Sequence, residues 1–179
     1  MKERTDPELV VACLEGDRSA FPELVERYQI QIFNAAYRIT GNRTDAQDVA
    51  QAAFLKVFER LDQFDPKYRF FSWIYKICVN EALNLVGKRR PWQAIDLEAA
   101  DPAANPERDA DASEIGRAIQ LAVLELKPAL RVAIVLRHFR GLSYDEMGEV
   151  IGIPVKTVKS RLFAARRELR RVLDAQQLR

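Results

Sequence analysis

The sequence predicts an all-α fold made of two small helical domains joined by a flexible acidic linker. Apolar residues recur at the i, i+3, i+4, i+7 spacing of one helical face along most of the chain. A stretch with three prolines, many alanines and an acidic excess interrupts this pattern and is typical of a mobile linker. The 179 residues, 48% of them hydrophobic, suffice for one ordinary domain or two small ones. We therefore expect domains over residues 1–92 and 114–179, with the linker at 93–113.

The N-terminal domain is predicted to be a bundle of three or four helices. A helical pattern runs over residues 21–39, and "TGNRTD" then supplies a glycine stop and capping side chains for a second helix over 49–61. The proline-containing break "DQFDPKYR" separates this helix from a third over about 70–86. A short helix around residues 8–14 would complete the bundle, in which the apolar stripes pack against one another.

The C-terminal domain has the spacing of a helix-turn-helix. Helical periodicity resumes at residue 115, stops at "KP", restarts at residue 130 and ends at Gly141. Ser143 and Glu146 form a capping box for the next helix, which Gly152 ends. Pro154 then suits the start of the last helix, because its missing N–H would be unpaired there in any case. Two helices joined by such a short turn are typical of a DNA-binding motif.

The last helix has two unlike faces. The apolar face should pack inward and consists of Val158, Leu162, Ala165, Leu169 and Val172. The opposite face consists of Lys156, Ser160, Phe163, Arg167 and Arg171, flanked by Lys159 and Arg170. An aromatic ring at the centre of a cationic face favours entry into a DNA groove over the alternative, a merely solvated surface. The residues expected at duplex DNA are Lys156, Thr157, Lys159, Ser160, Phe163 and Arg167.

A polar stripe also marks the third helix of the N-terminal domain. It consists of Lys76, Asn80, Asn84 and Lys88, at strict i, i+4 steps. Because asparagine is a poor helix former, two in register invite a functional reason, although a plain solvent-facing stripe would also fit. The preceding segment "FDPKYRFFSWIYK" mixes many aromatic rings with cations. We expect Phe71 and Tyr75 in the core, and the surplus rings suit stacking on unpaired bases.

Composition narrows the class of protein further. The net charge of +2 hides 14 basic and 13 acidic residues over 1–90, 1 and 7 over 91–114, and 13 and 6 from 115 onward. The basic C-terminal part indicates a polyanionic partner. Cys13 and Cys78 lie in apolar helical patterns and are predicted to be buried thiols, and together with the single histidine, His138, they cannot make a metal cluster or a catalytic triad.

The same totals set expectations about cofactors, activity and location. We expect no cofactor and no enzymatic activity, because no nucleophile, base and orienting group recur in a recognisable spacing. The sequence has no run of eighteen apolar residues and no signal peptide. A cytoplasmic protein without direct membrane association is therefore predicted.

Four motifs together resemble a known family. They are "AFPELVERYQIQIFNAAYRITGN", "DAQDVAQAAFLKVFERLDQF", "FFSWIYKICVNEALNLVGKRR" and "LRHFRGLSYDEMGEVIGIPVKTVKSRLFAARREL". In this order, across nearly the whole chain, they are similar to the extracytoplasmic-function (ECF) group of bacterial sigma factors. The resemblance implies that the N-terminal domain binds the clamp helices of the largest RNA polymerase subunit and melts and reads the minus-ten promoter element. It implies that the C-terminal domain binds the polymerase flap and reads the minus-thirty-five element.

The resemblance also implies roles for particular residues. The core-polymerase surface would include Asp48, Gln51, Phe54 and Lys56. The melted minus-ten strand would be held by Phe64, Lys67, Phe70, Trp73, Lys76, Asn80 and Asn84. The six residues of the last helix would read the minus-thirty-five duplex. An anti-sigma factor is implied as a further partner, and the acidic linker would pass through polymerase channels, unless it is simply a soluble tether.

Some positions depart from the family pattern. Lys156 stands where glycine is common and Ala164 where many members carry arginine, which affects the minus-thirty-five contacts. Ala52 replaces a frequent glutamate in the polymerase-binding helix, and Gly148 replaces the usual alanine at a cost of about 1 kcal/mol. The alternative function is a stand-alone helix-turn-helix regulator acting as a dimer, which would bind duplex DNA tightly without polymerase.

Overall fold

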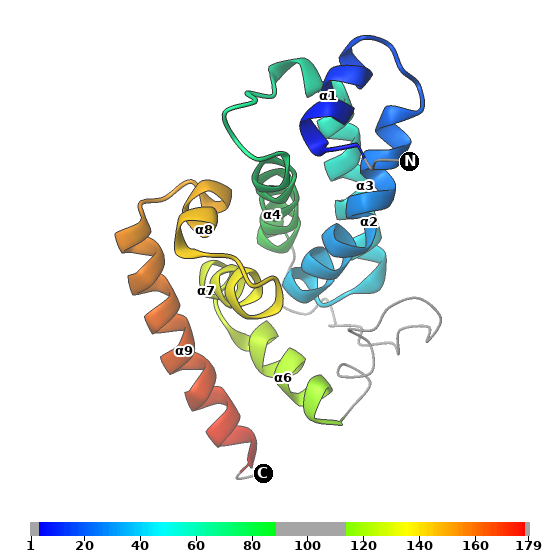
Figure 1. Cartoon of the computed structure of the whole chain (residues 1–179). Coiled ribbons are helices and arrows are strands. Elements are labelled where there is room, and N and C mark those ends of the chain that lie inside the picture. Colours follow the sequence, from blue (N-terminus) through cyan, green and yellow to red (C-terminus); the bar gives the residue numbers. More distant parts are fainter. Residues whose placement is uncertain (1–3, 89–113, 178–179) are drawn as a thin grey trace.

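The computed structural model describes residues 4–88 and 114–177 as two groups of helices, and no strand occurs within these ranges (Figure 1). The all-α prediction is therefore confirmed. The predicted acidic linker at 93–113 lies outside the described residues. None of the described helices is both long enough and apolar enough to cross a lipid bilayer.

The N-terminal group is a bundle in which the long helices α2, α3 and α4 pack against one another. Its elements are α1 (Asp6–Leu14), α2 (Ala20–Thr40), α3 (Arg43–Glu59), the 3₁₀ turn η1 (Leu61–Gln63) and α4 (Phe70–Lys88). The apolar stripe predicted for α2 is largely buried, and Leu24 and Ile32 are among the most enclosed side chains. The helix boundaries fall within a few residues of those predicted, because the periodicity that defines each stripe also creates the core.

The turn between α2 and α3 follows the predicted stop and cap. Gly41 adopts φ 73°, the left-handed conformation that glycine reaches at little cost, and its N–H donates to the Tyr37 carbonyl at 2.8 Å. The Asn42 side chain then accepts a hydrogen bond of 3.0 Å from the Asp45 amide and caps α3.

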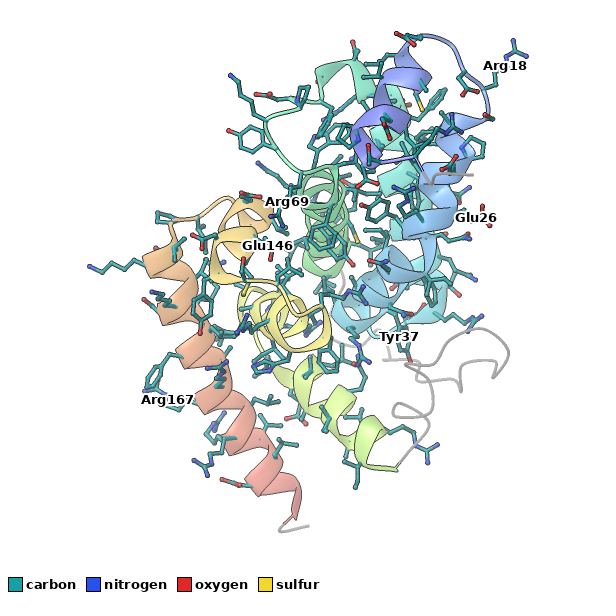
Figure 2. All side chains as sticks on the ribbon, in the orientation of Figure 1. Arg18, Glu26, Tyr37, Arg69, Glu146 and Arg167 are labelled. Carbon is teal, nitrogen blue, oxygen red and sulfur yellow. The ribbon has the colours of Figure 1, made fainter. Side chains whose placement is uncertain are left out.

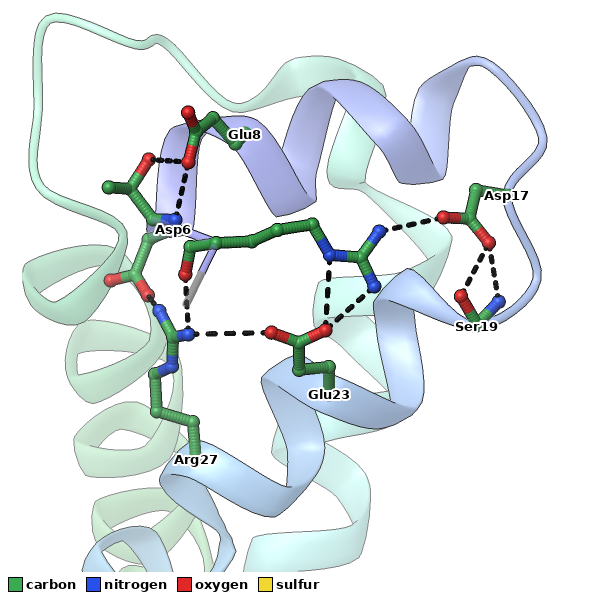
Figure 3. A network of polar contacts seen from close by, with 8 residues as sticks. Asp6, Glu8, Asp17, Ser19, Glu23 and Arg27 are labelled. Atoms are coloured by element: carbon green, nitrogen blue, oxygen red, sulfur yellow. Dashed lines mark hydrogen bonds and ion pairs between the residues drawn. The ribbon is translucent and has the colours of Figure 1, made fainter. Parts of the chain in front are cut away.

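Charged side chains fasten α1 onto α2 (Figure 3). The Arg4 guanidinium lies 2.8 Å from Asp17 and 2.7 Å from Glu23, while Arg27 lies 2.5 Å from Asp6. Hydrogen bonds from the Ser19 side chain and from Arg4 lower the pKa of Asp17 to about 2. The network fixes how the first helix enters the bundle.

The C-terminal group contains the predicted helix-turn-helix. Its elements are α6 (Glu114–Glu125), α7 (Pro128–Ile134), the π-helical turn η2 (Val135–Phe139), α8 (Tyr144–Ile151) and α9 (Val155–Gln177). The Arg140 amide donates to the Val135 carbonyl at 3.1 Å, the wide i to i+5 step of a π-helix. This turn was not predicted from the sequence. It carries residues that contact the N-terminal group.

The two groups of helices pack directly against each other. In Figure 1, α8 lies beside α4, and α7 with η2 lies near the C-terminal end of α2. The buried apolar side chains of both groups form one continuous cluster. Two domains that share a tether and nothing else, as the sequence suggested, are therefore only part of the arrangement.

Candidate functional site

The polar stripe on α4 faces solvent. Lys76, Asn80 and Asn84 are exposed, and the opposite face of the helix buries Ile74 and Cys78 in the core. Steps of four residues place the three polar side chains one above another along the helix. The structure thus brings together the three α4 residues that the sequence singled out for single-stranded DNA.

An aromatic cluster closes the N-terminal end of this stripe. Phe64, Phe70 and Trp73 contact one another with ring centroids 5.2 to 5.9 Å apart. Phe64 and Trp73 are partly exposed, but Phe70 is only 3% exposed and also meets Tyr28 at 5.5 Å. Three such rings stabilise the start of α4 and leave two ring edges facing outward.

Two aromatic assignments need correction. The prediction that Phe70 is available to stack on a base is wrong for this structure, because α2 and its neighbouring rings enclose it. Phe71, expected in the core, is only partly buried and lies against the fully buried Tyr75, with centroids 4.5 Å apart. Adjacent rings at the start of a helix point in directions 100° apart, so the choice depends on how α4 rotates against α2.

The loop before α4 offers residues that the sequence reading passed over. Tyr68 is 59% exposed, and Arg69 is exposed beside it. Lys67, which was predicted, is also exposed, and its amide donates to the Asp65 carboxylate at 3.0 Å within the turn. Tyr68 could have been found from its position between two cations and directly after a proline turn.

The helix-turn-helix is built as predicted. The Ser143 hydroxyl accepts from the Glu146 amide at 3.2 Å, and the Glu146 carboxylate accepts from the Ser143 amide at 2.8 Å. That backbone hydrogen bond is the main reason why the pKa of Glu146 is lowered. Gly152 ends α8 with φ 74°. Gly148 has a use here, because a Cβ on it would lie 3.0 Å from the Ile153 carbonyl oxygen in the turn.

The two faces of α9 are also confirmed. Val158, Leu162 and Ala165 are fully buried against the domain. All six predicted DNA residues, Lys156, Thr157, Lys159, Ser160, Phe163 and Arg167, are exposed. Phe163 is 69% exposed, and Arg167 extends away from the rest of the molecule in Figure 2. The outer face of α9 therefore presents an uncovered aromatic ring among cations.

Tyr144 is a further residue of this surface. Its ring lies 5.0 Å from the Arg137 guanidinium on one side and 5.7 Å from the Lys159 ammonium on the other. Cations near an aromatic face are attracted by its quadrupole. The ring therefore favours a position of the Lys159 side chain near the first turn of α9. The sequence gave no signal for this contact, which joins α8 to α9 through side chains.

A groove between α2 and α3 forms the other candidate surface. It has a volume of about 750 Å³ and is lined by Phe21, Val25, Gln29, Ile30, Phe33, Asn34, Arg43, Gln47, Ala50, Gln51, Phe54, Leu55 and Phe58. Phe58 is 62% exposed, and Ile30 and Leu55 are exposed as well. Apolar side chains left open in one groove typically mark a protein contact.

The predicted polymerase residues divide between two faces of α3. Gln51 and Phe54 line the groove, and Asp48 is exposed. Lys56 lies elsewhere, because its ammonium forms an ion pair of 2.6 Å with Glu81 on α4. Its assignment to the same surface as Gln51 is therefore wrong. The groove residues that the sequence reading missed, such as Leu55, are apolar residues outside the buried stripe of their helix.

The only histidine of the chain forms a structural contact. Its Nε2 accepts a hydrogen bond of 3.2 Å from Arg166 on α9. Burial, Arg166 and Arg137 all lower the pKa of His138, so the neutral ring is favoured. Among residues 4–88 and 114–177, no three histidine, cysteine or acidic side chains gather as a metal site would require. Cys78 is buried as predicted, whereas Cys13 is only partly buried.

Comparison with known proteins places these surfaces in a family. Models of Sigma-70 region 2 and Sigma-70 region 4 match residues 24–91 and 116–169. The ECF RNA polymerase sigma factor SigW of Bacillus subtilis (strain 168) is 33% identical over 171 residues, covering 89% of this chain and 91% of SigW.

Solved structures agree in fold. CnrH in complex with the cytosolic domain of CnrY is 28% identical with a TM-score of 0.70, covering 93% of this chain and 96% of CnrH. RpoE of Bartonella quintana, solved with the anti-sigma factor NepR, is 21% identical with a TM-score of 0.68, covering 86% of this chain and 96% of RpoE. The chain therefore belongs to the ECF group of RNA polymerase sigma factors.

Proposed function

We propose that this sigma factor initiates transcription by reading a promoter at two points, with α4 on the melted minus-ten strand and α9 on the minus-thirty-five duplex. The observation that carries the proposal is the pair of exposed polar faces on separate helix groups, one rich in amides and rings and the other in cations. A stand-alone regulator would have no use for the first of these faces. On this proposal residues 1–92 and 114–179 are the two working domains.

The α4 surface suits unpaired bases. Asn80 and Asn84 can hydrogen-bond base edges through both their amide donors and carbonyl acceptors. Trp73, Phe64 and the exposed Tyr68 offer rings for stacking, which contributes about 1–3 kcal/mol per base. A base removed from the duplex stack costs a few kcal/mol, so strand opening is favoured only where the pocket accepts the base that is released.

The α9 surface suits the major groove. Phe163 can contact thymine methyl groups, while Lys159 and Arg167 can reach phosphates or guanine edges. Each phosphate contact releases counterions, so binding through this face weakens as salt rises. Lys156, which stands where the family commonly has glycine, adds a cation at the start of the helix and should alter the base preference.

The groove between α2 and α3 is proposed to receive the clamp helices of the largest polymerase subunit. An amphipathic helix buries its apolar side chains in such a groove, and the exposed Phe58 and Leu55 supply the matching surface. Asp48, Gln51 and Phe54 lie on or beside it. We place the polymerase flap on the C-terminal helix group, and the whole activity in the cytoplasm, where bacterial RNA polymerase works.

An anti-sigma factor is proposed as a second protein partner. RpoE of Bartonella quintana was solved with such a protein. A partner that filled the α2–α3 groove would exclude polymerase from the same apolar surface.

Reconstituted transcription tests the proposal. Core bacterial RNA polymerase and this protein are incubated with a library of random promoters, and the transcripts are sequenced. We expect initiation from a defined promoter class, loss of open complexes with Asn80→Ala/Asn84→Ala, and loss of duplex recognition with Phe163→Ala. Glu15→Ala, an exposed change at the end of α1, serves as the control. Tight operator binding without polymerase and no specific initiation would instead support the stand-alone regulator.

The polymerase surface has its own matched pair. Phe58 and Val11 are both exposed apolar residues, but only Phe58 lines the groove. Phe58→Ala should weaken binding to core polymerase measurably, and Val11→Ala should not. Equal affinities for the two variants would move the polymerase surface away from this groove.

A further inference from the structure

The contact between the two helix groups is more specific than incidental packing. Where α8 meets α4, the buried Ser72 hydroxyl donates to the Glu149 carboxylate at 2.7 Å. Arg69, in the loop before α4, forms an ion pair of 2.6 Å with Glu146 of α8, and Figure 2 shows the two side chains next to each other. Two carboxylates of the C-terminal group thus contact the helix proposed to hold the minus-ten strand.

Buried arginines join the groups at a second place. The Arg38 guanidinium lies 3.6 Å from the centre of the Phe139 ring and donates to Gln120 at 3.3 Å. Arg131 donates to the carbonyl of Ile39 at 2.5 Å, near the end of α2. Both arginines are less than 10% exposed.

These buried cations point to a built interface. A buried guanidinium is costly unless its donors are satisfied, and here its partners come from the other helix group. Arg131 also meets the Leu126 carbonyl at 3.1 Å and that of Leu124 within its own group. A cation at the end of α2 is further favoured by the helix dipole.

The carboxylates lie beside the DNA-reading stripe. Ser72 and Lys76 are one turn apart on α4, so Glu149 stands next to the first cation of the stripe. Negative charge at this position repels a phosphate backbone approaching the same helix. The exposed Arg69, a cation that could otherwise meet DNA, is also occupied by Glu146.

Promoter geometry requires the two groups to separate. Elements named minus ten and minus thirty-five lie about 25 base pairs apart, or ~85 Å at 3.4 Å per base pair. A compact chain of this length has a radius of gyration of only ~16 Å. With α8 docked on α4, α9 and the α4 stripe cannot occupy both elements at once.

We propose that the docked arrangement is a closed, self-inhibited state of the sigma factor, in which Glu146 and Glu149 act as an internal acidic ligand of the minus-ten surface. This rests on the proposed function for its consequence, though not for its geometry. Binding to polymerase and promoter must break the contacts of Ser72, Arg38 and Arg131 across the interface. Closure therefore competes with initiation.

Small-angle X-ray scattering of the full chain tests closure without any DNA. Glu149→Arg removes the acceptor of Ser72 and sets a cation near Arg69, so we expect a larger radius of gyration. Asp174→Arg makes the same charge change at an exposed site near the end of α9 and should leave the radius unchanged. An unchanged radius for a folded Glu149→Arg protein would overturn the closed state.

A second pair of variants probes the interface from the other helix group. Gln31 on α2 accepts a hydrogen bond of 3.1 Å from Arg140. Gln31→Arg places two guanidinium groups together and should expand the protein, whereas Gln31→Glu offers a carboxylate and should keep it compact. If both variants gave the same radius, the proposed interface would be wrong.

DNA binding then tests the competition. The probe is a fluorescein-labelled pool of random single strands of ~12 nucleotides, followed by anisotropy. Glu149→Arg should bind several-fold more tightly than Asp174→Arg, and equal affinities would overturn the role of the acidic ligand. If no variant bound DNA or polymerase, the proposed function would fall, while a change of radius would still support closure.

Discussion

Glu146 is a residue whose protonation bears on stability. Its pKa is lowered, first by the hydrogen bond from the Ser143 amide, then by the Ser143 hydroxyl and by Arg69. A carboxylate with a depressed folded pKa stabilises the protein above its unfolded pKa of ~4.3, and that contribution is lost as pH falls through the folded value.

We therefore predict that the free energy of unfolding falls as the pH drops from 5 towards 3, and that Glu146→Gln reduces this dependence. Urea unfolding at a series of pH values measures both. The exposed Asp174→Asn serves as the control and should keep the wild-type slope. A pH dependence that is identical in Glu146→Gln and wild type would contradict the role given to this cap.

The two thiols should differ in reactivity. Burial raises the pKa of Cys78 to about 12, and its thiol faces the Ile32 carbonyl at 3.7 Å. Cys13 is partly exposed, although burial also raises its pKa. Since the thiolate is the nucleophile, we predict that a disulfide reagent at pH 8 modifies one thiol in the native protein and two after denaturation. Cys13→Ser should abolish the native reaction, and a remaining fast thiol would disprove the assignment.

At the scale of the element, α9 separates stability from recognition in neighbouring residues. Leu162 is buried and Phe163 is exposed. We predict that Leu162→Ala costs about 2–5 kcal/mol of unfolding free energy. Phe163→Ala should stay within ~0.5 kcal/mol of wild type while losing affinity for promoter duplex. Denaturant unfolding and duplex binding of the two variants provide the comparison, and a large stability loss in Phe163→Ala would show that the ring is structural.

The turn between α8 and α9 sets the value of Gly148. In an ordinary helix interior, replacing glycine by alanine gains about 1 kcal/mol. Here the new Cβ would lie 3.0 Å from the Ile153 carbonyl, so the turn must shift to accept it. We predict that Gly148→Ala gives no gain in thermal stability. A full gain of ~1 kcal/mol would show that the turn adjusts freely.

Sequence periodicity predicted the helices well because the same spacing that defines an apolar stripe also defines which residues are buried. It identified both faces of α9 and the exposed Asn80 and Asn84. It failed at Phe70 and Phe71, because neighbouring aromatic residues differ only in how the helix is rotated. It also failed at Lys56, whose partner Glu81 lies 25 residues away on another helix.

At the scale of the whole molecule, the interface between the helix groups could not be predicted from local pattern. Arg38 and Arg131 appear in the sequence as ordinary cations in helical segments, yet both are buried. The partners across this interface are 77 to 109 residues apart. Only the folded chain brings them together.

The continuous core predicts cooperative unfolding. Because buried apolar side chains of both groups form one cluster, we expect the wild-type chain to unfold in a single calorimetric transition. Glu149→Arg should uncouple the groups and broaden or split that transition, whereas Asp174→Arg should not. A wild-type chain with two separate transitions would indicate that the groups unfold independently.

The placement of α4 and α9 on separate helix groups of one chain has a consequence for affinity. Once one surface has bound the promoter, the other searches only the volume that the chain allows, so its effective concentration is high. Two weak contacts can then hold as firmly as one that is 10²–10⁴ times stronger, by a rough general estimate. They also dissociate one at a time, so a polymerase leaving the promoter never has to break the full attachment in a single step.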